Sequence, residues 1–537
     1  MEKRSILCLV VLTAVVLAPP QPGGAAAFLQ SGCLKVPNSA FDGNVMSTLT
    51  YISKAMNLVS KFTAAFGNFR LSNAVSDCAD LLDLSADELS RTLSASQTGK
   101  SSGTGKMSAD LRTWLSAALV NQDTCIDGFE GTNSFVKELV AGSLGQITSS
   151  VREIINMVRD VPGQGKPING GSTAKGGSGG GKGVGKPRGG RKLAMAGDDS
   201  FPSWISPKSR KLLVASGVPT PNVVVAADGS GNFTKLMDAV AAAPDHSATR
   251  FVIYVKKGVY AENVEIKRKK TNIMIYGDGM DTTIITGNRS FVDGWTTYRT
   301  ATFAVSGSGF IARDLTIQNT AGPQKHQAVA FRSDSDLSAL YRCAFRGYQD
   351  TLYTHTNRQF YRECTITGTV DFIFGNAVTV FQSCTIQPKK GLPNQKNTIT
   401  AQGRKEPEDV SGFSFQSCNI KADTDLQQAS GNSSMYTYLG RPWKKYSRTV
   451  IMESYIGDVV RPEGWLEWNG NLFLDTLFYA EYMNYGPGSA LGSRVKWPGY
   501  HVFNSSAQAM NFTVAEFIEG NLWLPQTGVK YIAGLVA

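Results

Sequence analysis

The sequence has 537 residues, of which 42% are hydrophobic, and a formal net charge of +11. This length exceeds what one ordinary hydrophobic core accommodates, so we expect more than one domain, with enough apolar residues for globular folding. The positive charge suits a polyanionic partner, but no basic helix or RNA-binding signature is present, which argues against nucleic acid.

The first 27 residues have the features of a secretory signal peptide. Lys3 and Arg4 precede an apolar run from Ile6 to Leu17, and small residues follow at 25–27. The run is short for a membrane span, and no later stretch is long enough to be one. We therefore predict a secreted protein from which residues 1–27 are removed. Glycosylation sequons fit secretion and begin at Asn232, Asn288, Asn432, Asn504 and Asn511.

Residues 28–160 are predicted to be helical. The segments "AVSDCADLLDLSADELSRTL" and "DLRTWLSAALVNQDTCIDGF" place apolar residues at helical spacing, without the strict alternation that is typical of strands. A four-helix bundle is the natural way to bury such apolar stripes.

Residues 161–213 are predicted to be a linker. They begin with a stretch rich in glycine and lysine and contain the basic motifs "RKLA" (Arg191–Ala194) and "RKLL" (Arg210–Leu213). Basic pairs in an exposed segment of a secreted chain suggest cleavage by a processing protease. Solvated charge without cleavage is the other interpretation of the same residues.

From residue 214 to 537 the sequence changes to short β-rich runs separated by Gly, Asn and Asp. A four-residue signature recurs: "NIMI" (272–275), "DLTI" (314–317), "RCAF" (342–345), "ECTI" (363–366), "SCTI" (383–386), "SCNI" (417–420) and, more weakly, "ESYI" (453–456). A repeat of roughly 20 residues made of strands is typical of a stacked solenoid. Because the regular leucines of a leucine-rich repeat are missing, we predict a right-handed parallel β-helix.

The cysteines are consistent with this stacking. Of the eight, Cys8 leaves with the signal peptide, and the remaining odd number requires at least one unpaired or intermolecular thiol. Cys343, Cys364 and Cys384 are 21 and 20 residues apart and are expected to lie one above another, with Cys364–Cys384 a plausible disulfide. The cysteines are too scattered, and too poor in neighbouring His, for a zinc site.

The same period brings four polar residues together. Asp371 lies 21 residues after Asp350, and Gln349 lies 22 residues after Gln327. On successive turns of a β-helix the two carboxylates would be on the order of 5 Å apart, the spacing of neighbouring strands. Two carboxyls this close do not both ionise easily, so one can serve as an acid while the other is a nucleophile. The two amides can donate hydrogen bonds to an oxyanion.

This constellation suits acyl transfer but does not prove it. The same residues could form a structural polar ladder, and carboxylates ~5 Å apart also fit a retaining glycosidase. A serine triad is disfavoured, because no Gly-x-Ser-x-Gly motif occurs and the chain has only four His residues.

Further residues suited to binding a sugar follow in "YLGRPWKKYSR" (438–448). Arg441 can pair with a carboxylate of the enzyme or of a substrate. Trp443 offers a flat face to a sugar ring, and Trp465 and Trp468 add aromatic surface. An Arg–Trp packing pair at a turn is the structural alternative.

These motifs identify a resemblance. "GYQDTLY", "DFIFGNA", "LGRPWKKYSR", "GPQKHQAVA" and "DGSGNFTK" resemble the signature blocks of plant pectinesterases, over essentially all of residues 219–537. The helical segments resemble the pectinesterase-inhibitor region that precedes the enzyme in the family's precursors.

The resemblance implies roles for individual residues. Asp371 matches the nucleophile that attacks the methyl ester of a galacturonate unit, Asp350 the general acid and base, and Gln349 the residue that stabilises the transition state. Thr297, Gln327, Arg441 and Trp443 match positions that contact the substrate. No metal or organic cofactor is expected.

The resemblance also bears on the disulfides of the helical region. Cys78 and Cys125 match one of the two bridges usual in the inhibitor family. Only Cys33 remains of the other bridge, so that bridge is in doubt.

We therefore expect a secreted pectin methylesterase precursor, a carboxylic ester hydrolase that acts on homogalacturonan in the cell wall. The helical region is expected to keep it inactive in cis until a protease cuts at the basic motif, with "RKLL" the better candidate. The alternatives are a β-helix enzyme that cleaves the pectin backbone, as a hydrolase or lyase, and a non-catalytic solenoid that binds the wall.

Overall fold

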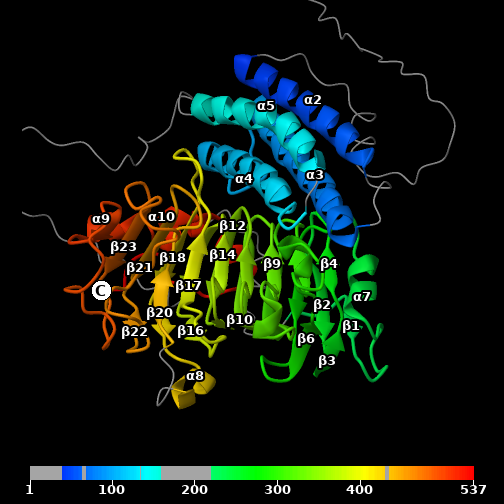
Figure 1. Cartoon of the computed structure of the whole chain (residues 1–537). Coiled ribbons are helices and arrows are strands. Elements are labelled where there is room, and N and C mark those ends of the chain that lie inside the picture. The colour runs from blue at the N-terminus through cyan, green and yellow to red at the C-terminus, as the bar shows by residue number, and fades with distance from the viewer. Residues whose placement is uncertain (1–38, 63–67, 133–134, 159–218, 430–434, 537) are drawn as a thin grey trace, which may run out of the picture.

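The computed structural model describes residues 39–62, 68–132, 135–158, 219–429 and 435–536. They form two parts, shown in Figure 1: a helical region (39–158) and a β region (219–536). The predicted signal peptide and the whole of the predicted linker, with both basic motifs, lie outside the described residues. No helix among the described residues is both long and apolar enough to cross a membrane.

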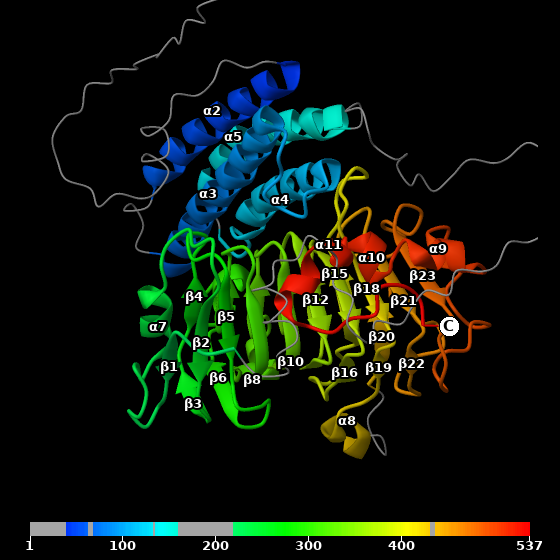
Figure 2. The same ribbon diagram turned by 180° about the vertical axis from the view of Figure 1, so that it is seen from behind.

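Four long helices make up the helical region: α2 (Ala40–Ser60), α3 (Phe69–Thr98), α4 (Met107–Asp127) and α5 (Phe135–Met157). The side chain of Asn68 accepts a hydrogen bond from the Leu71 amide at the start of α3, and Gly99, with φ of 66°, ends that helix in the left-handed conformation that glycine adopts without strain. Figures 1 and 2 show α3 and α4 against the β region and α2 and α5 farther out.

The core of the helical region includes apolar residues of the two segments predicted to be helical, among them Leu81, Leu89, Trp114 and Leu115. Cys78 of α3 and Cys125 of α4 form a disulfide, the pairing that the family resemblance implied.

The β region is a parallel β-helix, since every pairing of its strands is parallel. One face is a seven-stranded sheet in the order β4 (Val264–Ile266), β7 (Phe303–Val305), β9 (Phe331–Ser333), β11 (Leu352–Thr354), β14 (Ile373–Gly375), β17 (Asn397–Gln402) and β20 (Thr437–Gly440).

The other faces belong to a seventeen-stranded sheet. Its strands are β1 (Val223–Val225), β2 (Phe251–Val255), β3 (Gly258–Ala261), β5 (Ile273–Tyr276), β6 (Thr283–Gly287), β8 (Ile311–Asn319), β10 (Ser338–Arg346), β12 (Arg358–Arg362), β13 (Thr365–Gly368), β15 (Val378–Gln382), β16 (Thr385–Pro388), β18 (Gly412–Gln416), β19 (Asn419–Ile420), β21 (Arg448–Met452), β22 (Tyr455–Ile456), β23 (Phe478–Tyr482) and β24 (Tyr500–Val502). Short helices flank the strands: α7 (Leu236–Ala242), α8 (Thr424–Ala429), α9 (Ser506–Met510), α10 (Val514–Phe517), α11 (Gly520–Trp523) and the 3-10 turns η2 (Thr297–Thr300), η3 (Pro323–Lys325) and η4 (Leu524–Thr527).

The recurring signature marks one corner of this β-helix. Its first residue takes the left-handed conformation in all seven copies, with φ between 49° and 57°: Asn272, Asp314, Arg342, Glu363, Ser383, Ser417 and Glu453. Its fourth residue is buried in every copy, from Ile275 to Ile456. The polar residue therefore turns the chain, and the apolar residue three positions later fills the interior.

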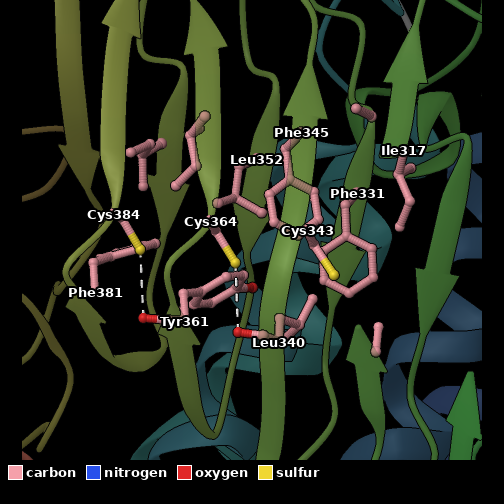
Figure 3. Packing of buried hydrophobic residues seen from close by; sticks show 14 of the residues in the cluster. Ile317, Phe331, Leu340, Cys343, Phe345, Leu352, Tyr361, Cys364, Phe381 and Cys384 are labelled. Carbon is pink, nitrogen blue, oxygen red and sulfur yellow. Dashed lines mark hydrogen bonds between the residues drawn. The ribbon is translucent and has the colours of Figure 1, made fainter. Parts of the chain in front are cut away.

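The cysteines stack as predicted, but the predicted Cys364–Cys384 disulfide is wrong. Both residues are buried free thiols, as is Cys343 (Figure 3). Cys418 is a buried free thiol as well. The Cys364 thiol donates to the Leu340 carbonyl at 3.4 Å, and the Cys384 thiol to the Tyr361 carbonyl at 3.5 Å. Parallel side chains on neighbouring strands keep their Cβ atoms about 4.8 Å apart, which exceeds the ~3.8 Å that is usual in disulfides.

The helical region packs on the seven-stranded sheet. Tyr298, Val329, Tyr353 and Phe374 of the β region belong to the same buried apolar cluster as the helical core. The two parts therefore share a hydrophobic interface on the face of the β-helix that also presents Asp350 and Asp371.

Candidate active site

Asp350 and Asp371 occupy equivalent positions on adjacent turns of the β-helix. Each precedes a strand of the seven-stranded sheet by two residues, and Leu352 of β11 pairs with Ile373 of β14. Both aspartates take the left-handed conformation, with φ of 63° and 51°. The 21-residue spacing in the sequence is thus the register of the strands, and it places the two side chains beside each other.

Asp371 is held by three hydrogen bonds from two residues. Arg441 donates from Nε to Oδ1 at 2.8 Å and from Nη2 to Oδ2 at 2.6 Å. The Thr398 hydroxyl donates to Oδ1 at 2.6 Å and accepts the Asp371 backbone N–H at 2.9 Å. A bidentate arginine and a second donor fix the plane of the carboxylate and compensate its charge.

The surroundings of Asp350, unlike those of Asp371, disfavour a charged carboxylate. Asp350 is 8% exposed. Burial raises the pKa of Asp350 well above its ordinary value, the charge of Asp371 raises it further, and Arg441 lowers it. Burial thus favours the protonated form of Asp350, whereas Asp371 is paired with an arginine, and this difference suits the separate roles of an acid and a nucleophile.

The two aspartates line a cavity of about 250 Å³. All of the predicted site residues line it as well: Thr297, Gln327, Gln349, Arg441 and Trp443. Five segments that are far apart in the sequence are thus brought together.

Sequence reasoning missed several residues of the site. Tyr353 and Phe374 line the cavity from the middle of β11 and β14, with their rings stacked at 4.2 Å between centroids. Both lie three residues after a site aspartate, within the quoted motifs, so strand alternation and the 21-residue register could have found them. Thr398 gave no signal, because its partner is reached only across the pairing of β14 with β17.

Trp465 and Trp468 lie in different environments. Trp468 lines the cavity and packs against the Arg441 guanidinium at 4.3 Å from its ring centroid. Trp465, which was also predicted to add aromatic surface, is 1% exposed and stacks on Tyr479 in the core. The prediction that Trp465 adds aromatic surface is therefore wrong, because its ring is buried in the core of the β-helix.

The helical region forms part of the cavity wall. Thr124, Asp127, Gly128 and Glu130, at and just beyond the end of α4, line it together with the β-region residues. The charge of Glu130 also contributes to raising the pKa of Asp350. The end of α4 therefore forms part of the boundary of the cavity that the two aspartates line.

Among the residues described by the structure, no group of three or more His, Cys, Asp and Glu is arranged to hold a metal ion. The site offers a carboxylate paired with an arginine, a buried carboxyl group whose pKa is raised, two glutamine amides and aromatic faces. This set can perform acyl transfer through a carboxylate nucleophile.

Comparisons with known proteins identify relatives of both parts of the chain. The family profile described as Pectinesterase matches residues 222–521, and the profile described as Plant invertase/pectin methylesterase inhibitor matches residues 20–160. A Prunus persica protein named as a pectinesterase/pectinesterase inhibitor is 60% identical over 535 residues, which cover 99% of this chain and 96% of that protein. A probable pectinesterase/pectinesterase inhibitor of Arabidopsis thaliana is 58% identical over 513 residues, or 95% and 94% of the two chains.

A solved structure is also similar. The pectin methylesterase from carrot shares 53% sequence identity, with a TM-score of 0.59, over 60% of this chain and 100% of the carrot chain.

Proposed function

This chain belongs to the pectinesterase family, and on that premise we propose that it hydrolyses the methyl esters of galacturonate units in pectin, releasing methanol and pectate. The observation that supports this most is the pairing of Asp371 with Arg441 beside Asp350, whose pKa is raised. The family assignment alone would not say which side chains act.

In the first half of the reaction, an Asp371 oxygen attacks the ester carbonyl carbon. The carbonyl oxygen becomes an oxyanion that accepts hydrogen bonds from the Gln349 and Gln327 amide groups. The carbon–methoxy bond then breaks, the methoxy oxygen takes the proton of Asp350, and methanol leaves. Asp371 is left joined to the galacturonate as an acyl-enzyme.

In the second half, Asp350 is a carboxylate and accepts a proton from water. The resulting hydroxide adds to the acyl carbon, and the bond to Asp371 breaks. The products are the galacturonic acid unit, which loses its proton to the solvent and becomes a carboxylate, and the restored enzyme, with Asp350 protonated again. Arg441 steadies Asp371 in both halves, because it holds both carboxylate oxygens before attack and after release.

Aromatic residues would hold the sugar rings. Trp443, Trp468 and Phe374 line the cavity, and Trp443 meets Phe374 edge-on at 6.0 Å between centroids. Flat apolar faces of this kind suit the C–H surfaces of sugar rings. Thr297 also lines the cavity and would offer its hydroxyl to a neighbouring unit.

The helical region would keep this site closed in the precursor. The end of α4 lines the cavity, and Lys444, next to Trp443, donates to Asp127 at 3.0 Å. We propose that cleavage at the basic motif, preferably at Arg210–Leu213, precedes activity in the cell wall after secretion. If methanol release were equal before and after cleavage of the chain at 161–213, this part of the proposal would be wrong.

The activity itself is tested with methyl-esterified pectin and the cleaved chain. We expect methanol to appear while the length of the polysaccharide stays constant. Shortened polysaccharide without methanol would instead identify an enzyme that cleaves the backbone.

A further inference from the structure

Every acidic residue of α3 and α4 contacts the β region. These two helices contain five and three Asp or Glu residues, respectively. The contacts are Asp77 and Asp80 with Arg299, Asp83 and Asp87 with Arg268, Glu88 with Asn357, Asp110 with Arg358, Asp123 with Lys405, and Asp127 with Lys444. Seven of these eight side chains, all but Glu88, pair with a cation of the β region, so the inner face of the helical region is an acidic array that faces cations.

Four of these cations form what we call the cationic track: Arg268, Arg299, Lys405 and Lys444. Arg268 follows β4 and Arg299 precedes β7, whereas Lys405 follows β17 and Lys444 follows β20. Strands β11 and β14, which present the two aspartates, lie between these pairs in the sheet order. Six strand spacings separate β4 from β20, so the track runs for roughly 29 Å across the catalytic cavity.

Short hydrogen bonds join the cationic track to the carboxyl groups of the helical region. Arg268 donates to Asp83 from Nε at 2.5 Å and from Nη2 at 3.0 Å, and to Asp87 at 3.0 Å. Arg299 donates to Asp80 at 2.6 Å, and Lys405 to Asp123 at 2.7 Å. These side chains are partly exposed even in the precursor, at 14% for Arg268 and 20% for Arg299.

Removal of the helical region would leave the track without its carboxylates. The proposed reaction creates that same group, a free carboxylate, on each galacturonate unit it processes. A de-esterified galacturonan presents carboxylates along an extended chain, and its charge is complementary to a row of arginines and lysines.

We infer that the helical region imitates a chain of free uronates, and that de-esterified galacturonan binds the cationic track and competes with the helical region for it. This inference rests on the proposed function for the identity of the polysaccharide. Once the linker is cut, the acidic product itself would help to displace the helical region. The product would thereby promote the release of further active enzyme.

Competition on the full chain tests this. A chain with a specific protease site placed within 161–213 is cut, held on a support by a C-terminal tag, and treated with a galacturonic acid oligomer. We expect the oligomer to release the helical region at a concentration about tenfold or more below that of NaCl of equal charge. A neutral galactose oligomer of the same length is expected to release none.

An arginine-specific reagent then reports where the oligomer binds. We expect Arg268 and Arg299 to stay protected from phenylglyoxal when the oligomer displaces the helical region, and to become reactive when salt displaces it. Arg346 is the matched control, because it pairs with Asp281 outside the track and its reactivity should not change. Release no better than by salt, or reactive Arg268 and Arg299 after release by the oligomer, would overturn the inference.

The same preparation separates this inference from the proposed function. After release by salt and desalting, the β region is supplied with esterified pectin. Protection of the track without methanol release would contradict the proposed esterase activity but would support binding of the oligomer to the cationic track. Methanol release without protection would contradict only the inference that the oligomer binds the cationic track.

Discussion

Asp371 and Arg441 form a bidentate ion pair across 70 residues of sequence, with nitrogen–oxygen distances of 2.8 and 2.6 Å. Asp371 precedes β14 and Arg441 follows β20, and β17 lies between these strands. The guanidinium also packs on Trp468, so its own position is fixed. The nucleophile proposed here is therefore oriented by a residue that only the stacking of the β-helix brings within reach.

Replacing this arginine should cost activity more than folding. In Arg441→Gln the Asp371 carboxylate loses both guanidinium hydrogen bonds and its nearest cation. We expect kcat for methanol release to fall about 100-fold, the loss typical of a misplaced reacting group. Arg346→Gln, which breaks a surface ion pair with Asp281, is the control and should leave kcat unchanged. Near-normal kcat in Arg441→Gln would show that the pair does not serve catalysis.

Thr398 offers a finer test of how Asp371 is positioned. Thr398→Val keeps the shape of the side chain but removes the hydroxyl that donates to Asp371 Oδ1. A hydrogen bond to a charged group contributes about 1.5–3 kcal/mol, so kcat should fall roughly tenfold or more with KM little changed. Thr379→Val is a matched control, since Thr379 is also buried on a strand and its hydroxyl has no hydrogen-bond partner. An equal kcat in the two variants would rule out a positioning role for Thr398.

The site aspartates were predictable because a β-helix converts sequence spacing directly into spatial position. The offset between Asp350 and Asp371 equals the register of Leu352 with Ile373, and the recurring signature supplied that register. Why the signature begins with a polar residue was not evident from the sequence. The structure explains it by the left-handed corner.

Other features depend on contacts that the repeat of about 20 residues does not specify. Cys364 and Cys384 have the right spacing for a disulfide, yet stacking keeps their thiols parallel and unpaired. The fit of α4 over the cavity joins segments more than 200 residues apart, such as Thr124 and His355, whose hydrogen bond of 2.8 Å lies at the interface. Two independent parts must dock before such pairs exist, so a pass along one sequence does not find them.

Docking of the helical region should weaken as pH rises. Burial raises the pKa of Glu88 from 4.5 to about 8, at a position where its carboxylate oxygen accepts a hydrogen bond from Asn357 of the β region. Between these two values the docked state binds a proton that a solvated glutamate does not, so its stability falls as pH increases. Burial raises the pKa of Asp77 to about 6, which acts in the same direction over a lower window.

The measurement is the dissociation constant of the two parts after cleavage of the linker. We expect it to rise about tenfold or more between pH 5 and pH 8, and to change much less in Glu88→Gln. Glu138→Gln, on the exposed side of α5, should behave as the wild type. A dissociation constant that is independent of pH, or one with the same pH dependence in Glu88→Gln, would contradict the prediction.

A reducing agent should lower the stability of the helical region and leave that of the β region unchanged. The Cys78–Cys125 disulfide closes a separation of 47 residues, and its loss should destabilise the helical region by about 4 kcal/mol on the chain-entropy estimate. Cys343, Cys364, Cys384 and Cys418 are buried thiols and should resist a thiol reagent until the β region unfolds. Thermal unfolding with and without reductant, with modified cysteines mapped by mass spectrometry, checks both statements. Modification of these four thiols in the native protein would be the contrary result.

The most direct measurement is methanol release from methyl-esterified pectin by the cleaved chain and its Asp371→Asn and Asp350→Asn variants, with Asp281→Asn as a surface control. Loss of the nucleophile should abolish turnover, and loss of the acid should lower kcat by about 100- to 10,000-fold, the usual contribution of general acid–base catalysis. The control should retain full activity. Methanol release at the unaltered rate by Asp371→Asn would contradict the account at its centre.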